Sequence, residues 1–193
     1  SVVLSDLLKT ILPSESDLDV FTRFKGNPII SPIKDNSWEA TATFNPACIM
    51  INNTIHILYR TLANDNTSYI GYATTKNGFD LEERLQVPIY SPREDFEIKK
   101  IPNGNSGCED PRLIKVGSLI YMCYTAYDSI GPPKVAVTSI KEKDFLKRNW
   151  IWSKPVILTP NGIDDKDTCF LPEKIGGQYM IMHRIGTDIC ADY

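Results

Sequence analysis

The chain has 193 residues, of which 42% are hydrophobic, and its formal net charge at pH 7 is −3. This length and apolar content are enough for one domain with a substantial core. The acidic balance offers no basic surface for nucleic acid or anionic lipid, and no apolar run reaches the roughly 18 residues of a membrane-spanning helix.

Residues 1–13 are predicted to form an amphipathic helix, because their leucines and isoleucines recur at helical spacing until Pro13 interrupts the pattern. The segment lacks the cleavage site of a signal peptide, so we expect a cytoplasmic protein. The five cysteines agree with this location, since their count is odd and no C-x-x-C spacing occurs. We expect them to be reduced core residues.

Three segments, each built around a proline, repeat a pattern of short strand, polar turn and second strand. The first strands are predicted at residues 44–50, 109–115 and 171–175. The second strands are predicted at residues 55–60, 120–125 and 179–184. Short strands separated by turn residues at regular intervals indicate an all-β fold.

Further strands complete each unit. Third strands are predicted at residues 69–75, 134–139 and 188–191, and fourth strands at residues 87–92 and 155–160. Segment 27–32 resembles another fourth strand that precedes any inner strand, as when an N-terminus closes the last blade of a ring. Four strands per unit indicate a β-propeller. Residues 14–193 would then hold about two and a half blades plus one closing strand, as a fragment of a larger ring.

The first strand of a propeller blade lines the central channel, so equivalent positions of the repeat should converge there. The positions before the aligning prolines are Asn45, Asp110 and Leu171, and the second strands of the first and third units end at Arg60 and Arg184. Converging acids and bases are what a site requires. Simpler interpretations stay open, because an Asp before a proline favours a turn and the arginines could form ion pairs between blades.

Six motifs, in this order and spacing, resemble glycoside hydrolase family 130, and within it the β-mannoside phosphorylases. They are Phe44-Asn-Pro46, Tyr59-Arg60, Gly107-Cys-Glu-Asp-Pro-Arg112, Tyr124-Thr-Ala-Tyr127, Phe170-Leu-Pro-Glu-Lys-Ile175 and His183-Arg184. The resemblance begins near Asn27 and covers about the N-terminal three-fifths of a family member. It implies a five-bladed β-propeller whose C-terminal blades are absent from this chain.

The resemblance implies inverting phosphorolysis of terminal β-linked mannosides in manno-oligosaccharides, which releases α-mannose 1-phosphate. Asp110 matches the general acid of the family, and Asn45 and Arg60 match residues that hold the mannose. Further candidates for substrate binding are Glu109, Arg112 and Tyr124. Candidates for phosphate binding are Lys174, Arg184 and His183.

This residue composition suits a phosphorylase. An inverting glycosidase needs an acid and a second carboxylate that activates water, whereas a phosphorylase needs cations that hold the phosphate nucleophile. Inorganic phosphate is then the co-substrate, and no metal or organic cofactor is expected. The expected partner is a β-mannoside oligosaccharide. Many relatives are oligomers, so the N-terminal helix could pack on a second copy of the chain, and packing on its own propeller is an equal alternative.

Two alternatives remain. A β-mannoside hydrolase of the same family would replace the basic phosphate ligands with glutamates, and Lys174 and Arg184 argue against it. A non-catalytic glycan-binding propeller would need no acid at position 110. Plainer interpretations also exist for two candidates, because His183 could be a hydrogen-bonded core histidine and Tyr124 a core aromatic residue.

Overall fold

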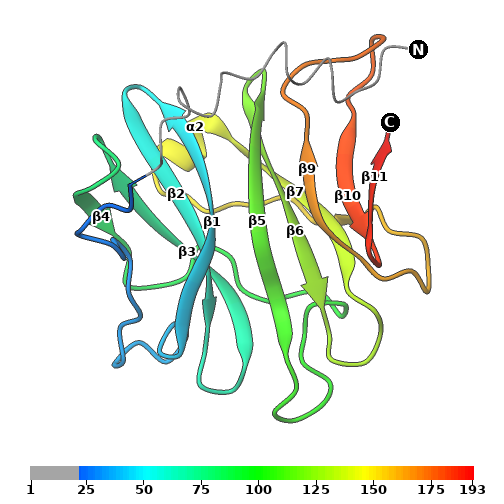
Figure 1. The fold of residues 1–193 in the computed structure, drawn as a ribbon, viewed down its shortest axis with the longest axis horizontal. Coiled ribbons are helices and arrows are strands. Elements are labelled where there is room, and N and C mark those ends of the chain that lie inside the picture. The colour runs from blue at the N-terminus through cyan, green and yellow to red at the C-terminus, as the bar shows by residue number, and fades with distance from the viewer. Residues whose placement is uncertain (1–21) are drawn as a thin grey trace.

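The computed structural model describes residues 22–193, which form an all-β structure (Figure 1). The helix predicted for residues 1–13 lies outside the described residues. One short helix, α2 (Glu142–Leu146), follows β7. The strands are β1 (Ala42–Ile51), β2 (Thr54–Leu62), β3 (Thr67–Thr75), β4 (Leu81–Arg84), β5 (Ser106–Val116), β6 (Leu119–Tyr127), β7 (Lys134–Lys141), β8 (Val156–Ile157), β9 (Asp165–Phe170), β10 (Ile181–Ile185) and β11 (Asp188–Asp192).

The first two units are antiparallel four-stranded meanders, as the repeat predicts. β1 to β4 form one unit and β5 to β8 the other. The β1–β2 turn uses Asn52 and Asn53, whose φ values of 51° and 58° suit the tight turn that matches strand twist. The units join through a short parallel pairing of β3 with β5, in which Ser68 lies opposite Gly107. Within residues 22–193 the sheets do not close into a ring (Figure 1).

The third unit is the sheet β9–β10–β11, and here one predicted strand is wrong. Residues 171–175 lie in the connection between β9 and β10, and the first strand of the unit is Asp165–Phe170. The connection turns at Gly176 and Gly177, with φ values of 60° and 84°. Pro172 therefore marks the end of a strand, whereas Pro46 and Pro111 lie inside theirs, so aligning the three prolines misplaced the unit.

Two outer segments also differ from prediction. The fourth strand of the first unit is β4, and the predicted strand at residues 87–92 contributes only an isolated bridge between Tyr90 and Ile70. Segment 27–32 contains no strand. It lies against the outer face of the first unit, where the Thr43 hydroxyl donates to the Ile30 carbonyl over 2.9 Å. The fourth strand of the second unit, β8, is confirmed within residues 155–160.

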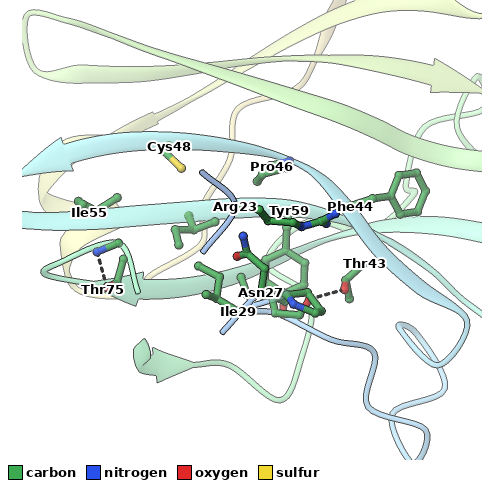
Figure 2. Close-up of a pocket in the computed structure, with 14 residues that line it drawn as sticks. Arg23, Asn27, Ile29, Thr43, Phe44, Pro46, Cys48, Ile55, Tyr59 and Thr75 are labelled. Atoms are coloured by element: carbon green, nitrogen blue, oxygen red, sulfur yellow. Dashed lines mark hydrogen bonds between the residues drawn. The ribbon is translucent and has the colours of Figure 1, made fainter. Parts of the chain in front are cut away.

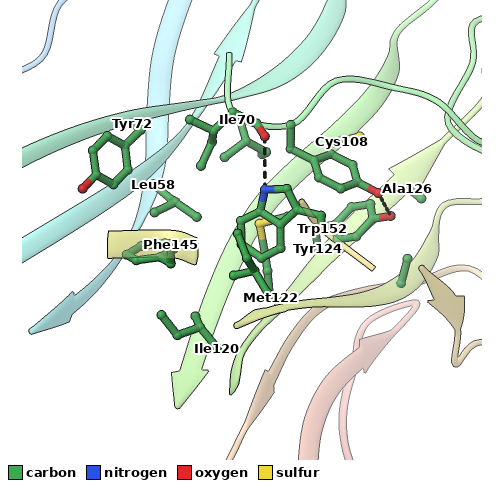
Figure 3. Packing of buried hydrophobic residues seen from close by; sticks show 14 of the residues in the cluster. Leu58, Ile70, Tyr72, Cys108, Ile120, Met122, Tyr124, Ala126, Phe145 and Trp152 are labelled. Carbon is green, nitrogen blue, oxygen red and sulfur yellow. Dashed lines mark hydrogen bonds between the residues drawn. The ribbon is translucent and has the colours of Figure 1, made fainter. Parts of the chain in front are cut away.

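The main core lies between the first and second units (Figure 3). Alternate residues of β2, β3 and β6 point into it, and Phe145 of α2 and Trp152 cover it. Its fully buried large aliphatic side chains are Leu58, Ile70, Ile120, Met122 and Ile140. Each such side chain stabilises the fold by about 1.5–3 kcal/mol, so this interface fixes how the two units are oriented.

The outer face of the first unit carries a cavity of about 580 Å³, shown in Figure 2. Pro46, Cys48 and Ile55 line it from β1 and β2, and Asn27 and Ile29 line it from the N-terminal side. Farther along β1, the Met50 side chain is 67% exposed. The outer face of this unit is therefore apolar and only partly covered by described residues.

All five cysteines are free thiols, and Cys108 and Cys123 are buried. In residues 22–193 we find no helix with the length and hydrophobicity needed to cross a bilayer.

The junction between the first two units depends on a glycine. A Cβ on Gly107 would lie 2.2 Å from the Ser68 carbonyl oxygen, and the φ of 108° strains any other residue. We expect Gly107→Ala to lower the free energy of unfolding by about 3 kcal/mol or more, from overpacking and strain together. Urea unfolding measures this loss.

Gly117→Ala is the matched control, because its φ is 58° and no atom lies within 4 Å of the added Cβ. It should cost about 1 kcal/mol from backbone strain alone. Equal losses in the two variants would show that close packing at the junction is unimportant.

Candidate active site

Each unit carries the same irregularity near the start of its first strand. The register of β1, β5 and β9 shifts at Asn45, Asp110 and Asp167, which have left-handed φ values of 45°, 50° and 58°. Such a β-bulge bends the strand and redirects a side chain. Asn and Asp tolerate this backbone conformation better than most residues. The structure therefore presents an Asn or Asp side chain at an equivalent position in all three units.

Arg60 joins the bulges of the first two units. Its Nη1 lies 3.1 Å from Asp110 Oδ1 and its Nη2 lies 2.7 Å from Glu109 Oε1. Its Nε donates to Ser68 Oγ over 3.1 Å. Asn45 Nδ2 donates to the same Asp110 oxygen over 2.8 Å. The pairs are mostly buried, with side-chain exposures of 14–16%, so they are stronger than surface ion pairs.

The electrostatics of this cluster act most clearly on Glu109. Burial raises the pKa of its carboxyl above the usual 4.5, and the neighbouring Asp110 carboxylate adds to the rise. The Arg60 and Lys166 cations oppose it. Because folding then favours the protonated acid, the stability that Glu109 contributes is complete below its ordinary pKa and is lost as the pH rises through the folded value.

The third unit adds one cation near these acids and a second cation opposite the first on the neighbouring strand. Lys166 and Arg184 are paired across β9 and β10, and Lys166 lies close enough to act on Glu109. Arg184 Nε bonds Asp167 Oδ2 over 2.8 Å. The backbone N–H of Asp167 donates to Thr125 Oγ1 over 3.4 Å, which places the third bulge against the end of β6. Three units thus contribute to one polar cluster.

Two predicted phosphate ligands do not lie in this cluster with a free donor. Lys174 is in the β9–β10 connection, beyond the opposite end of β9, and its ammonium lies 5.1 Å from the centre of the Tyr179 ring. Both ring nitrogens of His183 are already paired, Nδ1 with Asp165 at 2.9 Å and Nε2 with Asp192 at 3.0 Å. Of the three predicted ligands, only Arg184 lies beside a bulge.

Two predicted substrate ligands are also placed differently from the rest. Tyr124 is 2% exposed, and behind the bulge its hydroxyl donates to Glu97 and lies 3.0 Å from the Tyr90 hydroxyl. Arg112 donates over 3.1 Å to the carbonyl of the adjacent Pro111, and among the described residues it forms no ion pair. The structure therefore brings Asn45, Arg60, Glu109 and Asp110 into contact, while Arg184 is bonded to the third bulge at Asp167.

Lys166 and Asp167 were missed by the sequence reasoning. The signal that could have found them is the position of Arg184, which lies near the end of the second strand of its unit, as Arg60 does. Arg184 on β10 lies opposite Lys166 on β9, so aligning the third unit on Arg184 leads to Lys166. Aligning the unit on Pro172 leads instead to the connection between β9 and β10. In residues 22–193 no group of three His, Cys, Asp or Glu side chains is arranged to hold a metal ion.

Comparison with known proteins agrees with the motifs. Residues 13–190 match the family model of glycoside hydrolase family 130, described as β-1,4-mannooligosaccharide phosphorylase. The chain is 34% identical over 181 residues to a β-1,2-mannobiose phosphorylase of Thermoanaerobacter sp., covering 87% of this chain and 55% of that protein. It is 31% identical over 174 residues to a 1,2-β-oligomannan phosphorylase of the same organism, covering 86% and 54%. The chain belongs to glycoside hydrolase family 130, and it spans about half the length of these relatives.

Solved structures show the same fold. A putative glycoside hydrolase from Bacteroides ovatus is 27% identical with a TM-score of 0.65, and the match covers 85% of this chain and 54% of that one. The β-1,2-mannobiose phosphorylase of Listeria innocua has a TM-score of 0.61 at 17% identity, covering 86% and 58%. The second likeness, at this identity, concerns the fold alone.

The Arg60 cation should control the protonation of Glu109. Arg60→Gln removes the nearest positive charge, so we expect the pKa of Glu109 to rise further above its usual value. A ¹³C NMR titration of the Glu109 carboxyl measures the change. Lys115→Gln is the control, because Lys115 lies on the same strand but pairs with Glu142. An unchanged Glu109 titration in Arg60→Gln would contradict the assignment.

Proposed function

We propose that this protein catalyses inverting phosphorolysis of terminal β-linked mannosides, with inorganic phosphate as co-substrate and α-mannose 1-phosphate as product. The observation that carries the proposal is the environment of Asp110. One carboxyl is held by a neutral amide and a guanidinium, and further cations lie in the third unit. The two curated relatives, both named as phosphorylases, support it.

Asp110 acts as the general acid in this proposal. Asn45 and Arg60 fix one of its oxygens at 2.8 and 3.1 Å, which leaves the other oxygen for the substrate. A general acid must reach the proton acceptor directly or through one hydroxyl, so a fixed carboxyl orientation matters. Glu109 then accepts a hydrogen bond from a mannose hydroxyl.

Lys166 and Arg184 hold the phosphate in this proposal. A phosphate nucleophile carries its own charge, so the site needs cations that offset it rather than a second carboxylate that activates water. Both cations come from the third unit, and the acid comes from the second. In the proposal, different units therefore hold the nucleophile and the acid, which suits inversion because the two must approach opposite faces of the anomeric carbon.

The relatives also favour a linkage. Both curated phosphorylases are named for β-1,2-linked mannosides, while the family model is named for β-1,4-linked ones. At 34% and 31% identity, the named relatives give the more specific guide. We therefore propose β-1,2-mannobiose or a short β-1,2-oligomannan as the preferred substrate.

The proposed architecture is a five-bladed propeller. The three observed units supply consecutive blades, and segment 27–32 would lie beside a closing blade. Two apolar faces support this arrangement, because Met50 at one end and Ile189 at the other are each 67% exposed. Cytoplasmic localisation, self-association and residues 14–193 as one domain stay predictions.

Product analysis tests the reaction. We expect mannose 1-phosphate from β-1,2-mannobiose only when inorganic phosphate is present. Asp110→Asn should lower the rate by at least roughly 100-fold, because it removes the general acid. Asp35→Asn, at an exposed position, is the matched control and should leave the rate unchanged.

Other products would contradict the proposal in distinct ways. Free mannose released equally with and without phosphate would mean a hydrolase. Sugar binding that is indifferent to phosphate, with no product, would mean a glycan-binding module. Product from β-1,4-mannobiose but not from the β-1,2 isomer would overturn the linkage.

Ring closure has its own test. Met50 should oxidise readily with hydrogen peroxide, while the fully buried Met122 should not. In a chain extended to five blades, Met50 should become protected, as measured by mass spectrometry. Equal oxidation of Met50 in both chains would contradict a closing blade on this face.

A further inference from the structure

Every bulge is backed by a buried pair. The side chain opposite each bulge on the neighbouring strand is buried, and each is bonded to a carboxylate that is 0–1% exposed. The three pairs are Tyr59 with Glu39, Tyr124 with Glu97, and His183 with Asp165. The three acids do not occupy equivalent positions in the sequence repeat. The pairs are therefore equivalent in the structure, although the sequence alone does not show it.

The pair behind Asp110 is the most completely bonded on its carboxylate. Glu97 Oε2 accepts the backbone N–H groups of Arg93 at 2.8 Å and Glu94 at 2.9 Å. Glu97 Oε1 accepts the Tyr90 hydroxyl at 3.0 Å and the Tyr124 hydroxyl. Both oxygens therefore have two donors, as a buried carboxylate requires.

All four donors to the Glu97 carboxylate are uncharged groups. Glu39 is paired with the Arg84 guanidinium at 2.7 Å, but Glu97 forms no ion pair among the described residues. The nearby Arg93 guanidinium lies over the Tyr90 ring, 4.7 Å from its centre, and donates to the Trp152 carbonyl. A buried charge without a cation depends on every hydrogen bond it accepts, so the two tyrosine hydroxyls are tightly held.

We propose that Glu97 is a positioning residue for Asp110 and acts through Tyr124. Tyr124 lies on β6 opposite the Asp110–Pro111 bulge, between the paired residues Glu109–Thr125 and Arg112–Cys123. Holding the Tyr124 hydroxyl in place also holds β6, the strand that pairs with the bulged part of β5. Asn45 and Arg60 reach Asp110 from the other unit, so a displaced bulge would lengthen both hydrogen bonds.

The Glu97 segment holds β6 at a second point. The backbone N–H of Lys100 donates to the Asp128 carbonyl over 3.0 Å, and its ammonium lies 2.9 Å from the Asp128 carboxylate. Asp128 directly follows β6. One segment therefore fixes both the middle and the end of the strand that backs the bulge. The catalytic consequence of this inference rests on the proposed function.

A pair of identical substitutions tests the inference. Tyr124→Phe removes the hydroxyl that reaches Glu97 and keeps the ring. Tyr72→Phe is the control, because the Tyr72 hydroxyl makes an equally buried bond, 2.7 Å from His56 Nδ1, in the same core cluster. Figure 3 shows the two rings on opposite sides of that cluster. Both variants should lose similar thermal stability.

The first readout needs no activity. In ¹⁵N NMR spectra, Tyr124→Phe should shift the Asn45 side-chain amide, whose N–H donates to Asp110, and Tyr72→Phe should not. Glu97→Gln, which keeps the side-chain size, should shift the same resonance. If the Asn45 amide stays in place in both Tyr124→Phe and Glu97→Gln, the inference is overturned.

The second readout is kinetic. Tyr124→Phe should lower kcat roughly tenfold with KM nearly unchanged, because misplacing an acid affects the transition state more than binding. Tyr72→Phe should leave kcat unchanged, and equal kcat losses in both variants would overturn a positioning role. If the unsubstituted chain forms no product, the proposed function fails, while the NMR comparison still decides the inference about Glu97.

Discussion

The site depends on one guanidinium that crosses between two repeats. Arg60 belongs to the first unit, and the two acids it binds, Glu109 and Asp110, belong to the second. Without this cation, two adjacent carboxylates would be mostly buried side by side, which is unfavourable through both desolvation and mutual repulsion. Arg60 therefore makes the acid pair compatible with folding, and it also sets the direction in which Asp110 points.

The backbone conformation at the bulges supports the contacts that Arg60 makes. Three bulges place Asn45, Asp110 and Asp167 in the left-handed region, at a cost that ordinary strand residues would not tolerate. Strain of this kind persists only when the surroundings hold it in place. Here the support comes from the buried carboxylate pairs behind the bulges and from the packed core between the first two units.

Much of the fold could be predicted because it follows from short apolar segments separated by turns. The inner strands of the first two units are rich in aliphatic and aromatic residues, and Asn52 and Asn53 mark the first hairpin. The third unit could not be placed so well. A β-bulge produces no regular pattern that can be recognised in the sequence. The third unit was therefore aligned on Pro172, which lies outside the strand.

The site was predicted in part for the same reason. Asn45, Arg60, Glu109 and Asp110 lie at positions that periodicity and motif fix together, and the structure brings them into contact. Lys166 was missed because its unit was shifted in the alignment. Tyr124 was predicted to bind substrate because it begins a motif, but alternation along β6 turns its side chain away from that of Thr125 and into the core.

The stereochemistry of the first product distinguishes inverting phosphorolysis from the other reactions that this site could catalyse. We would follow the reaction of the wild-type protein with β-1,2-mannobiose and inorganic phosphate by ¹H and ³¹P NMR from the first minutes. We expect α-mannose 1-phosphate as the initial product, because one acid together with cations that hold the phosphate allows a single inverting displacement. Initial formation of β-mannose 1-phosphate, or of free mannose alone, would contradict it.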